Sequence, residues 1–249
     1  MEPLHHPLSG FGYLLAGFRL LLRPALWPYV LLPLAINILV FGLLLWLATG
    51  QFGALVDTLT PSLPDWLSWL TWLLWLVFGL VAAIIVFFTF ALVANFIAAP
   101  FNGLLAEAVE RLLTNTAPPG GGSLRQALRE TPQALFDELR KLGYFLLWAV
   151  PLGLLFLVPF INLAAPLLWA LFSAWMLALQ YLDYPLGNHG LRFAAQRRRL
   201  RRQPLLGLGF GAAVLLATLV PLVNLMVMPA AVAGATRLWV ERLQQDSTP

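Results

Sequence analysis

Four long stretches of this chain contain no charged residue, and they constrain its fold more than any other feature. They cover residues 26–49, 66–106, 142–182 and 203–236. The hydrocarbon core of a bilayer is about 30 Å thick and is crossed by about 20 helical residues, so each stretch is long enough to reach across it. Because a backbone in lipid must satisfy its own hydrogen bonds, these stretches predict helices. The predicted fold class is therefore an all-α integral membrane protein.

The composition excludes a water-soluble fold. Hydrophobic residues make up 60% of the chain and charged residues 10%, whereas about 25% of the residues of soluble domains are charged. The absence of cysteine excludes disulfides, thiolate zinc sites and iron–sulfur clusters. The net charge of +4 does not indicate nucleic-acid binding, because the arginines flank the apolar stretches as membrane anchors do.

The first two stretches predict two long transmembrane helices. Residues 26–49 form one span of suitable length, and residues 66–106 form a second, longer one. A proline inside a helix removes a hydrogen bond and kinks the chain. Pro100 lies near the end of its stretch, so a single long crossing is favoured there over two shorter ones.

The last two stretches have prolines at their centres and predict helical hairpins. Residues 142–182 and 203–236 each have a central turn with one polar side chain, Asn162 in the first and Asn224 in the second. A turn that emerges into water normally carries several polar residues. This favours re-entrant hairpins that stop inside the protein, where irregular backbone is tolerated. Hairpins that cross the membrane completely are the alternative.

Two segments outside the stretches have the pattern of amphipathic surface helices. Residues 9–24 repeat apolar side chains at helical spacing, and residues 107–141 combine a Pro-Gly linker with a similar helix that Pro132 is expected to break. Arginines occur in both segments, whereas residues 50–65 carry only acidic charges. The positive-inside rule then places both termini and the long loops in the cytoplasm. The whole chain, residues 1–249, is predicted to form one membrane domain.

Polar side chains gather at the end of the second stretch, where their burial is costly. They are Asn95, Asn102, Glu107, Glu110 and Arg111. Glu107 and Arg111 are four residues apart and can pair on one helix face. The group is interpreted as the lining of a pore or gate, or else as an interfacial salt bridge that caps a protruding helix.

The segment 181–192 concentrates polar side chains on a turn between the two hairpins, where Pro185, Gly187 and Gly190 are expected to break the helix. His189 is a candidate proton carrier or a structural turn residue, and Arg192 is a candidate for contact with an anion. The sequence offers no set of metal ligands at suitable spacing. It also offers no nucleophile with an acid–base partner, so no metal site, catalytic residue or cofactor is predicted.

Several motifs resemble the CysZ sulfate permease family of bacterial inner membranes. They are Gly17-Phe-Arg-Leu, Pro33-Leu-Ala-Ile-Asn37, Asn95-Phe-Ile-Ala-Ala-Pro-Phe-Asn-Gly-Leu-Leu-Ala-Glu107, Tyr181-Leu-Asp-Tyr-Pro-Leu-Gly-Asn-His189, Pro221-Leu-Val-Asn224 and Pro229-Ala-Ala-Val-Ala-Gly-Ala-Thr236. The resemblance implies sulfate uptake for cysteine biosynthesis, through two long transmembrane helices and two hairpins that penetrate partway. It also implies oligomers built from dimers of antiparallel subunits, which conflicts with the single orientation that the arginines predict.

The resemblance further implies a sulfate site at the entrance of the first membrane helix, where the family has a Gly-Leu-Arg turn. This chain has Ala25, Leu26 and Trp27 there, so the guanidinium of the turn is missing and Arg23 is the nearest substitute. Helix amides can hold an anion without a particular side chain. The family's pore network corresponds to Glu107 and Arg111.

Sulfate permeation is thus the predicted function, either channel-like or proton-coupled. The predicted partners are sulfate, the lipid bilayer and further copies of the chain, but not nucleic acid. A non-transporting membrane scaffold or lipid-binding protein is the alternative, since amphipathic segments and an arginine run fit both.

Overall fold

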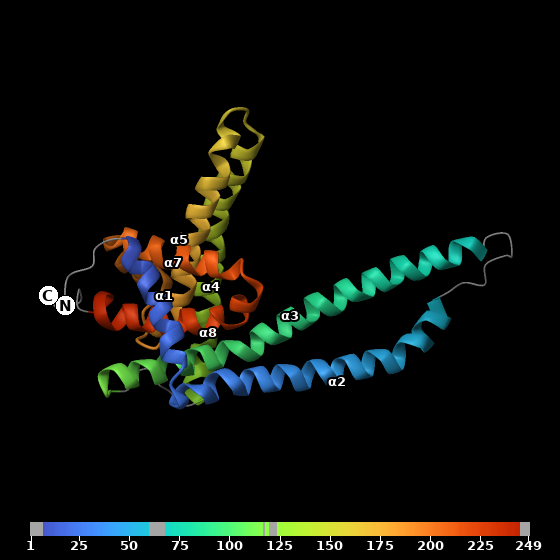
Figure 1. The fold of residues 1–249 in the computed structure, drawn as a ribbon, viewed down its shortest axis with the longest axis horizontal. Coiled ribbons are helices and arrows are strands. Elements are labelled where there is room, and N and C mark those ends of the chain that lie inside the picture. Colours follow the sequence, from blue (N-terminus) through green and yellow to red (C-terminus); the bar gives the residue numbers. More distant parts are fainter. Residues whose placement is uncertain (1–6, 60–67, 117, 120–123, 245–249) are drawn as a thin grey trace. The chain divides into compact units, whose positions relative to one another are not determined.

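The computed structural model is all-helical over the residues it describes, which are 7–59, 68–116, 118–119 and 124–244. Eight α-helices follow one another along this part of the chain (Figure 1). They are α1 (Pro7–Leu21), α2 (Trp27–Leu59), α3 (Ser68–Thr114), α4 (Leu124–Leu154), α5 (Ala165–Gly187), α6 (Phe193–Arg202), α7 (Pro204–Thr218) and α8 (Pro221–Leu238). Short helical turns occur at Pro24–Leu26, Leu155–Leu157 and Ile161–Leu163, and a π-helical turn, Trp239–Leu243, follows α8.

The chain divides into two compact units. One is Val30–Phe101, which contains most of α2 and of α3, and the other combines residues 1–29 and 102–249. In the first unit α2 continues ten residues past the predicted end of its span, as far as Leu59. The helix α3 passes through Pro100 without a break, so the stretch forms one long helix. Its single crossing of the membrane stays a prediction.

The larger unit is a bundle in which α1, α5, α7 and α8 pack against one another. Glycines let these helices approach closely: a Cβ at Gly17 of α1 would lie 1.9 Å from the carbonyl oxygen of Ala230 in α8, and one at Gly211 of α7 would lie 1.7 Å from that of Ala174 in α5. Small residues at helix contacts are typical of membrane bundles. The predicted amphipathic helix near the N-terminus is α1, which packs on α7 and α8 through such residues. Its in-plane position at the membrane surface stays a prediction.

The first predicted hairpin is formed by α4 and α5, which lie side by side and project from the bundle (Figure 1). Phe145 stacks on Phe172 across the pair, with ring centroids 5.6 Å apart. The connecting turn has Phe160 in the left-handed region, at a φ of 68°, and its side chain is 90% exposed. The expected break at Pro132 is wrong, because α4 runs continuously from Leu124 to Leu154. A helix accommodates one lost hydrogen bond when the bonds on both sides persist.

The second predicted hairpin is formed by α7 and α8. Its turn is formed by Leu219 and Val220 and so precedes the expected one, because α8 begins at Pro221 and Asn224 belongs to the first turn of that helix. Proline is favourable there, since the first helical N–H needs no intrahelical partner. The hairpin is apolar at its tip, where Leu219, Leu222 and Leu225 are all exposed.

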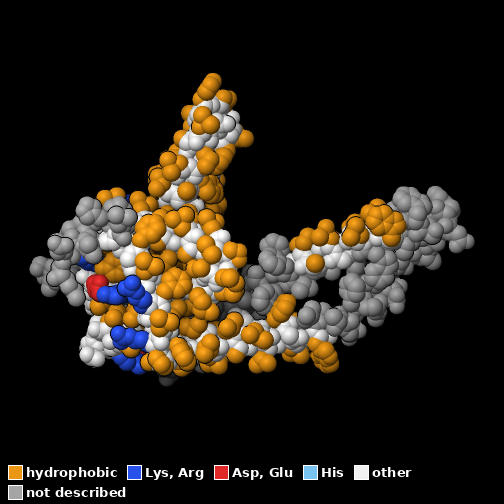
Figure 2. Space-filling model, viewed as in Figure 1, with side chains coloured by type: hydrophobic (Ala, Val, Ile, Leu, Met, Phe, Trp, Pro, Cys, Tyr) orange, Lys and Arg blue, Asp and Glu red, His pale blue; other side chains and the backbone are white. Residues whose placement is uncertain are grey.

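Four helical segments among the described residues are long and apolar enough to cross a membrane. They are Pro24–Leu44, Phe136–Leu157, Ala165–Gly187 and Pro221–Leu243. Large apolar side chains point outward along them, such as Leu39 of α2 and Leu147 of α4. Figure 2 shows hydrophobic side chains covering most of the visible described surface. Such a surface is stable in lipid and not in water, so the prediction of a helical membrane fold is confirmed at this level.

Candidate functional site

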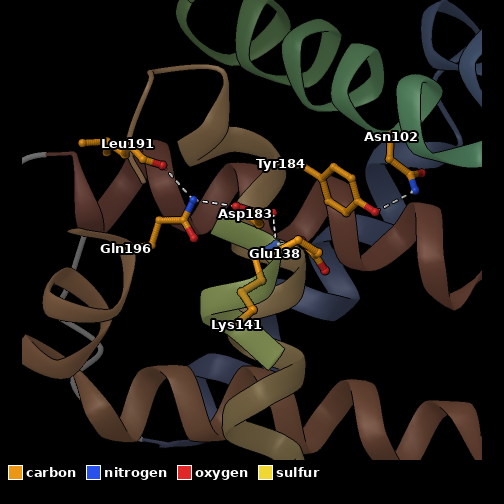
Figure 3. Close-up of polar contacts among 7 residues, drawn as sticks. All are labelled: Asn102, Glu138, Lys141, Asp183, Tyr184, Leu191 and Gln196. Carbon is orange, nitrogen blue, oxygen red and sulfur yellow. Dashed lines mark hydrogen bonds and ion pairs between the residues drawn. The ribbon is translucent and has the colours of Figure 1, made fainter. Parts of the chain in front are cut away.

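The C-terminal part of α3 meets α5 and α8 at a buried amide. Asn102 is 7% exposed, and its Nδ2 donates a hydrogen bond to the hydroxyl of Tyr184, 3.2 Å away (Figure 3). The same nitrogen lies 3.4 Å from the sulfur of Met228. The amide is thereby held in one orientation, as a buried polar group must be.

The turn after α5 is joined to α3 by a second amide and by a hydrogen bond between a histidine and a carboxyl group. Asn188 Nδ2 donates to the carbonyl oxygen of Gly103 at 3.0 Å. Two turns further along α3, Glu110 Oε1 lies 2.7 Å from His189 Nε2. Glu110 is only 3% exposed, and its Oε2 is buried without a hydrogen-bond partner. The His189 ring also packs on Trp239, with centroids 5.1 Å apart. Sequence reasoning placed Asn102 and Glu110 in one polar group and His189 in another segment, and the structure brings the three residues to one interface.

The helix α5 continues through Pro185 and ends at Gly187, so the predicted break is confirmed at the glycines and wrong at the proline. The proline lies within the last turn of α5, which ends at Gly187. Few hydrogen bonds remain to be lost there, and Leu182 and Leu186, each 1% exposed, anchor the helix by burial. The chain then reverses through Gly190, whose φ of 67° suits glycine.

The predicted pair of Glu107 and Arg111 is formed on α3. The arginine side chain is 55% exposed and the glutamate 18%. The pair therefore lies at the surface of its unit, whereas Glu110 on the same helix points inward. Asn95 lies in α3, but its side chain is outside the described residues. Arg192 is exposed, has an extended backbone and helps to line a cavity of about 370 Å³.

A second polar cluster borders this cavity, and sequence reasoning missed it. Asp183 accepts hydrogen bonds from Lys141 Nζ of α4 at 2.5 Å and from Gln196 Nε2 of α6 at 2.6 Å. Gln196 also donates to the carbonyl oxygen of Leu191 at 2.8 Å, as Figure 3 shows. Its sequence signal was weak: Lys141 is the one lysine of the chain and sits at the edge of an apolar stretch. Nothing local connects it with a residue on another helix.

The segment that corresponds to the family's anion turn lies before α2. Arg23 is exposed and extended, and Pro24–Leu26 forms a short 3₁₀ turn. Ala25 is exposed, whereas Leu26 is 1% exposed and faces the core. Trp27 donates its indole N–H to the carbonyl oxygen of Leu21, 3.2 Å away. Only Arg23 supplies a charge here, and any further contact to an anion has to come from the backbone.

The fold defines a multi-pass helical membrane protein with a few polar groups buried between its helices. Comparison with known proteins gives its family. The family model described as "Sulfate transporter CysZ/Etoposide-induced protein 2.4" matches residues 13–229. The chain therefore belongs to the CysZ sulfate transporter family, as its motifs predict.

Individual relatives are similar over almost their whole length. "Sulfate transporter CysZ" of Pseudomonas fluorescens (strain Pf0-1) is 48% identical over 233 residues, which are 94% of this chain and 93% of that protein. The protein of the same name from Pseudomonas aeruginosa (strain LESB58) is 49% identical, with 94% and 95% covered. That of Pectobacterium atrosepticum is 44% identical over 243 residues, with 97% and 88% covered. The resemblance thus extends over both units of the structure.

Proposed function

We propose that this protein carries sulfate across the bacterial inner membrane and so supplies sulfur for cysteine biosynthesis. The observation that carries the proposal is the near-complete match, at 48% identity, to a protein named as a sulfate transporter. The fold supports it, because several helices are suited to cross a membrane while polar side chains lie between them. An alternative role as a scaffold or lipid-binding protein would not require buried polar groups at this position.

Sulfate is a strongly hydrated dianion, so its path must replace water with oriented N–H donors and positive charge. We assign the charge to Arg23, Arg111 and Arg192, all exposed on the surface of the larger unit. Asn95 and Asn102 are assigned as hydrogen-bond donors. Binding through several weak contacts, rather than one buried arginine, allows the anion to leave again.

The entrance is proposed at Arg23 and the backbone of Ala25, Leu26 and Trp27. Two features support it: the segment starts α2, and the N-terminal N–H groups of a helix attract anions. The side chain of Leu26 is turned to the core and leaves the backbone as the contact surface.

The gate is proposed at the interface of α3 with the turn after α5. Glu110 and His189 join the two elements there, and Glu107 holds Arg111. A movement of α3 relative to the turn after α5 would separate Glu110 from His189, in channel-like and in proton-coupled transport alike. This makes the pair suited to control passage.

The hairpins are proposed to be re-entrant. The helix α7 has 15 residues, which at 1.5 Å per residue span about 22 Å, less than the roughly 30 Å of the hydrocarbon core. The apolar tips of both hairpins suit an end inside the membrane. We further propose that residues 1–249 act as one membrane domain and assemble into homo-oligomers built from dimers.

The function is tested by radiolabelled sulfate flux into liposomes that contain the purified protein. The wild type is expected to admit sulfate faster than empty liposomes. Arg111→Ala should lower the flux about tenfold or more, because a hydrogen bond to a charged group contributes about 1.5–3 kcal/mol. Arg140→Ala is the matched control, since Arg140 is an exposed arginine of α4 that pairs with Asp137 and is not among the residues assigned to the path.

One result would count against the proposed function, and another against the proposed path. Wild-type liposomes as tight to sulfate as empty lipid would leave the scaffold or lipid-binding role. Equal flux through Arg111→Ala and wild type would remove Arg111 from the path without affecting the function itself.

A further inference from the structure

One face of the helix α6 is fully used by contacts within the bundle. Phe193, Gln196 and Leu200 are buried on this face. Gln196 is bound to Asp183 and to the carbonyl oxygen of Leu191, and Leu200 packs on Gly207 of α7. The rotation of α6 about its axis is therefore fixed, and so is the direction in which its other side chains point.

The opposite face of α6 consists of arginines. Arg198, Arg201 and Arg202 are exposed, and their spacing of three and four residues puts them on one side of a helix. No acidic residue occurs in α6. We call these three residues the arginine face. Like charges so close repel one another, so the face gains free energy when an anion lies against it.

Aromatic rings hold two further arginines beside this face. The guanidinium of Arg197 lies 4.9 Å from the ring centroid of Tyr144, and that of Arg199 lies 5.1 Å from that of Trp239. Arg199 also donates to the carbonyl oxygen of Leu243 at 3.1 Å. These contacts are within the range of cation–π interactions, and they keep positive charge along the length of α6.

The neighbours of α6 show at which level of the membrane it lies. Its Gln196 binds Asp183, near the end of one candidate span, and through it Lys141, near the start of another. Immediately beyond these charges, α4 exposes large apolar side chains at Leu142, Leu146 and Leu147, which require lipid around them. The helix α6 therefore lies beside the ends of two candidate spans, and the ends of membrane-spanning helices lie at the depth of the lipid headgroups.

We propose that the arginine face of α6 is a binding site for anionic phospholipid headgroups. A guanidinium presents paired N–H donors that match the two free oxygens of a phosphodiester. Basic residues beside a membrane surface attract anionic lipids, each arginine adding to the affinity. Charge, position and fixed orientation favour a lipid over a soluble anion, because headgroups are already concentrated at this level.

The test compares the unfolding temperature of the purified full-length protein in detergent with added phosphatidylglycerol or phosphatidylcholine. A ligand that binds the folded state raises this temperature. Phosphatidylglycerol should raise it by about 5 °C more than phosphatidylcholine does. In Arg198→Gln/Arg201→Gln this difference should fall by more than half. Arg19→Gln/Arg140→Gln, which removes the same charge from exposed positions on α1 and α4, should retain it.

A measurement with sodium sulfate, at the same concentration of negative charge, distinguishes lipid binding from the binding of a free anion. An equal rise with sulfate, lost in Arg198→Gln/Arg201→Gln, would overturn the proposal in favour of a soluble anion. Equal unfolding temperatures in the two lipids for the wild type would overturn it as well, and so would a full lipid effect in the variant.

If the variant does not fold, the salt dependence of the wild type tests the proposal. The difference in unfolding temperature between the two lipids should shrink at about 1 M sodium chloride, where charges are screened within about 3 Å. An effect unchanged by salt would contradict the arginine face as its source.

Discussion

Two glutamates of α3 show how much the position of a single side chain decides. Glu107 pairs with an arginine that is half exposed, whereas Glu110 is buried against His189 and has one oxygen without a partner. Burying a carboxylate costs free energy that only a good partner offsets. Glu107 and Glu110 are only three positions apart on one helix. Yet Glu107 forms an ordinary surface pair, whereas Glu110 holds α3 against the turn after α5.

Replacing Glu110 by alanine should destabilise the protein far more than replacing Glu107. Glu110→Ala leaves the buried nitrogen of His189 without its partner, and the expected cost is about 2–3 kcal/mol. Glu107→Ala breaks an exposed i,i+4 pair and should cost less than about 1 kcal/mol. Thermal unfolding in detergent measures both. Similar losses for the two variants would show that Glu110 is not buried as described.

For single residues, the sequence predicts well which side chains belong to the candidate site. It predicts their contact partners less well. Asn102, Glu110 and His189 could be selected because polar groups beside apolar stretches are costly. Their contacts with Tyr184, Met228 and Trp239 join residues far apart along the chain. Such contacts arise only when the helices pack, so no local pattern indicates them. For the same reason the cluster around Asp183 was missed.

The close contact of the helix α1 with α8 can be tested by comparing two glycines of α1. A methyl group at Gly17 would collide with the backbone of α8, whereas a Cβ at Gly12 of the same helix meets nothing within 4 Å. Gly17→Ala should therefore cost at least about 2 kcal/mol, since the helices have to move apart. Gly12→Ala should be neutral or stabilise by up to about 1 kcal/mol, because alanine favours the helix. Equal unfolding temperatures for the two variants would rule out the contact.

The base of the hairpin formed by α4 and α5 depends on the ion pair of Lys141 and Asp183. In a double-mutant cycle with Lys141→Met and Asp183→Asn, the coupling free energy should be about 1–3 kcal/mol, because the pair is partly buried and shared with Gln196. The control cycle pairs Lys141→Met with Glu138→Gln. Glu138 contacts the same lysine but is 69% exposed, so its coupling should stay below about 1 kcal/mol. Both coupling free energies are obtained from chemical or thermal unfolding of the wild type, the two single variants and the double variant of each cycle.

The positions of the helices could be predicted from the charge-free stretches, but their ends could not. Proline was given too much weight as a helix breaker: α4 continues through Pro132 and α5 through Pro185. In both cases the hydrogen bonds and packing of the rest of the helix outweigh one missing bond. The reverse holds at Pro221, which starts α8 and so moves the turn of the second hairpin toward the N-terminus.

For the whole molecule, the asymmetry of arginines predicts one orientation in the membrane. The natural chain has no cysteine, so single cysteines can be introduced without other changes. Asp57→Cys, near the end of α2, should react with a membrane-impermeant maleimide in intact spheroplasts. Ala194→Cys, exposed on α6, should react only after permeabilisation. Half-labelling of both positions in intact cells would instead indicate subunits in opposite orientations, as the family resemblance implies.

The glycine-mediated contacts of α1 with α8 and of α5 with α7 limit how this protein can change shape. Helices whose backbones touch cannot slide past one another without losing their fit along the entire contact. The four-helix bundle is therefore a rigid frame, and any opening and closing during a transport cycle has to occur in the parts attached to it. Engineered cross-links that restrain the parts attached to the bundle, and not the bundle itself, would show which parts have to move during transport.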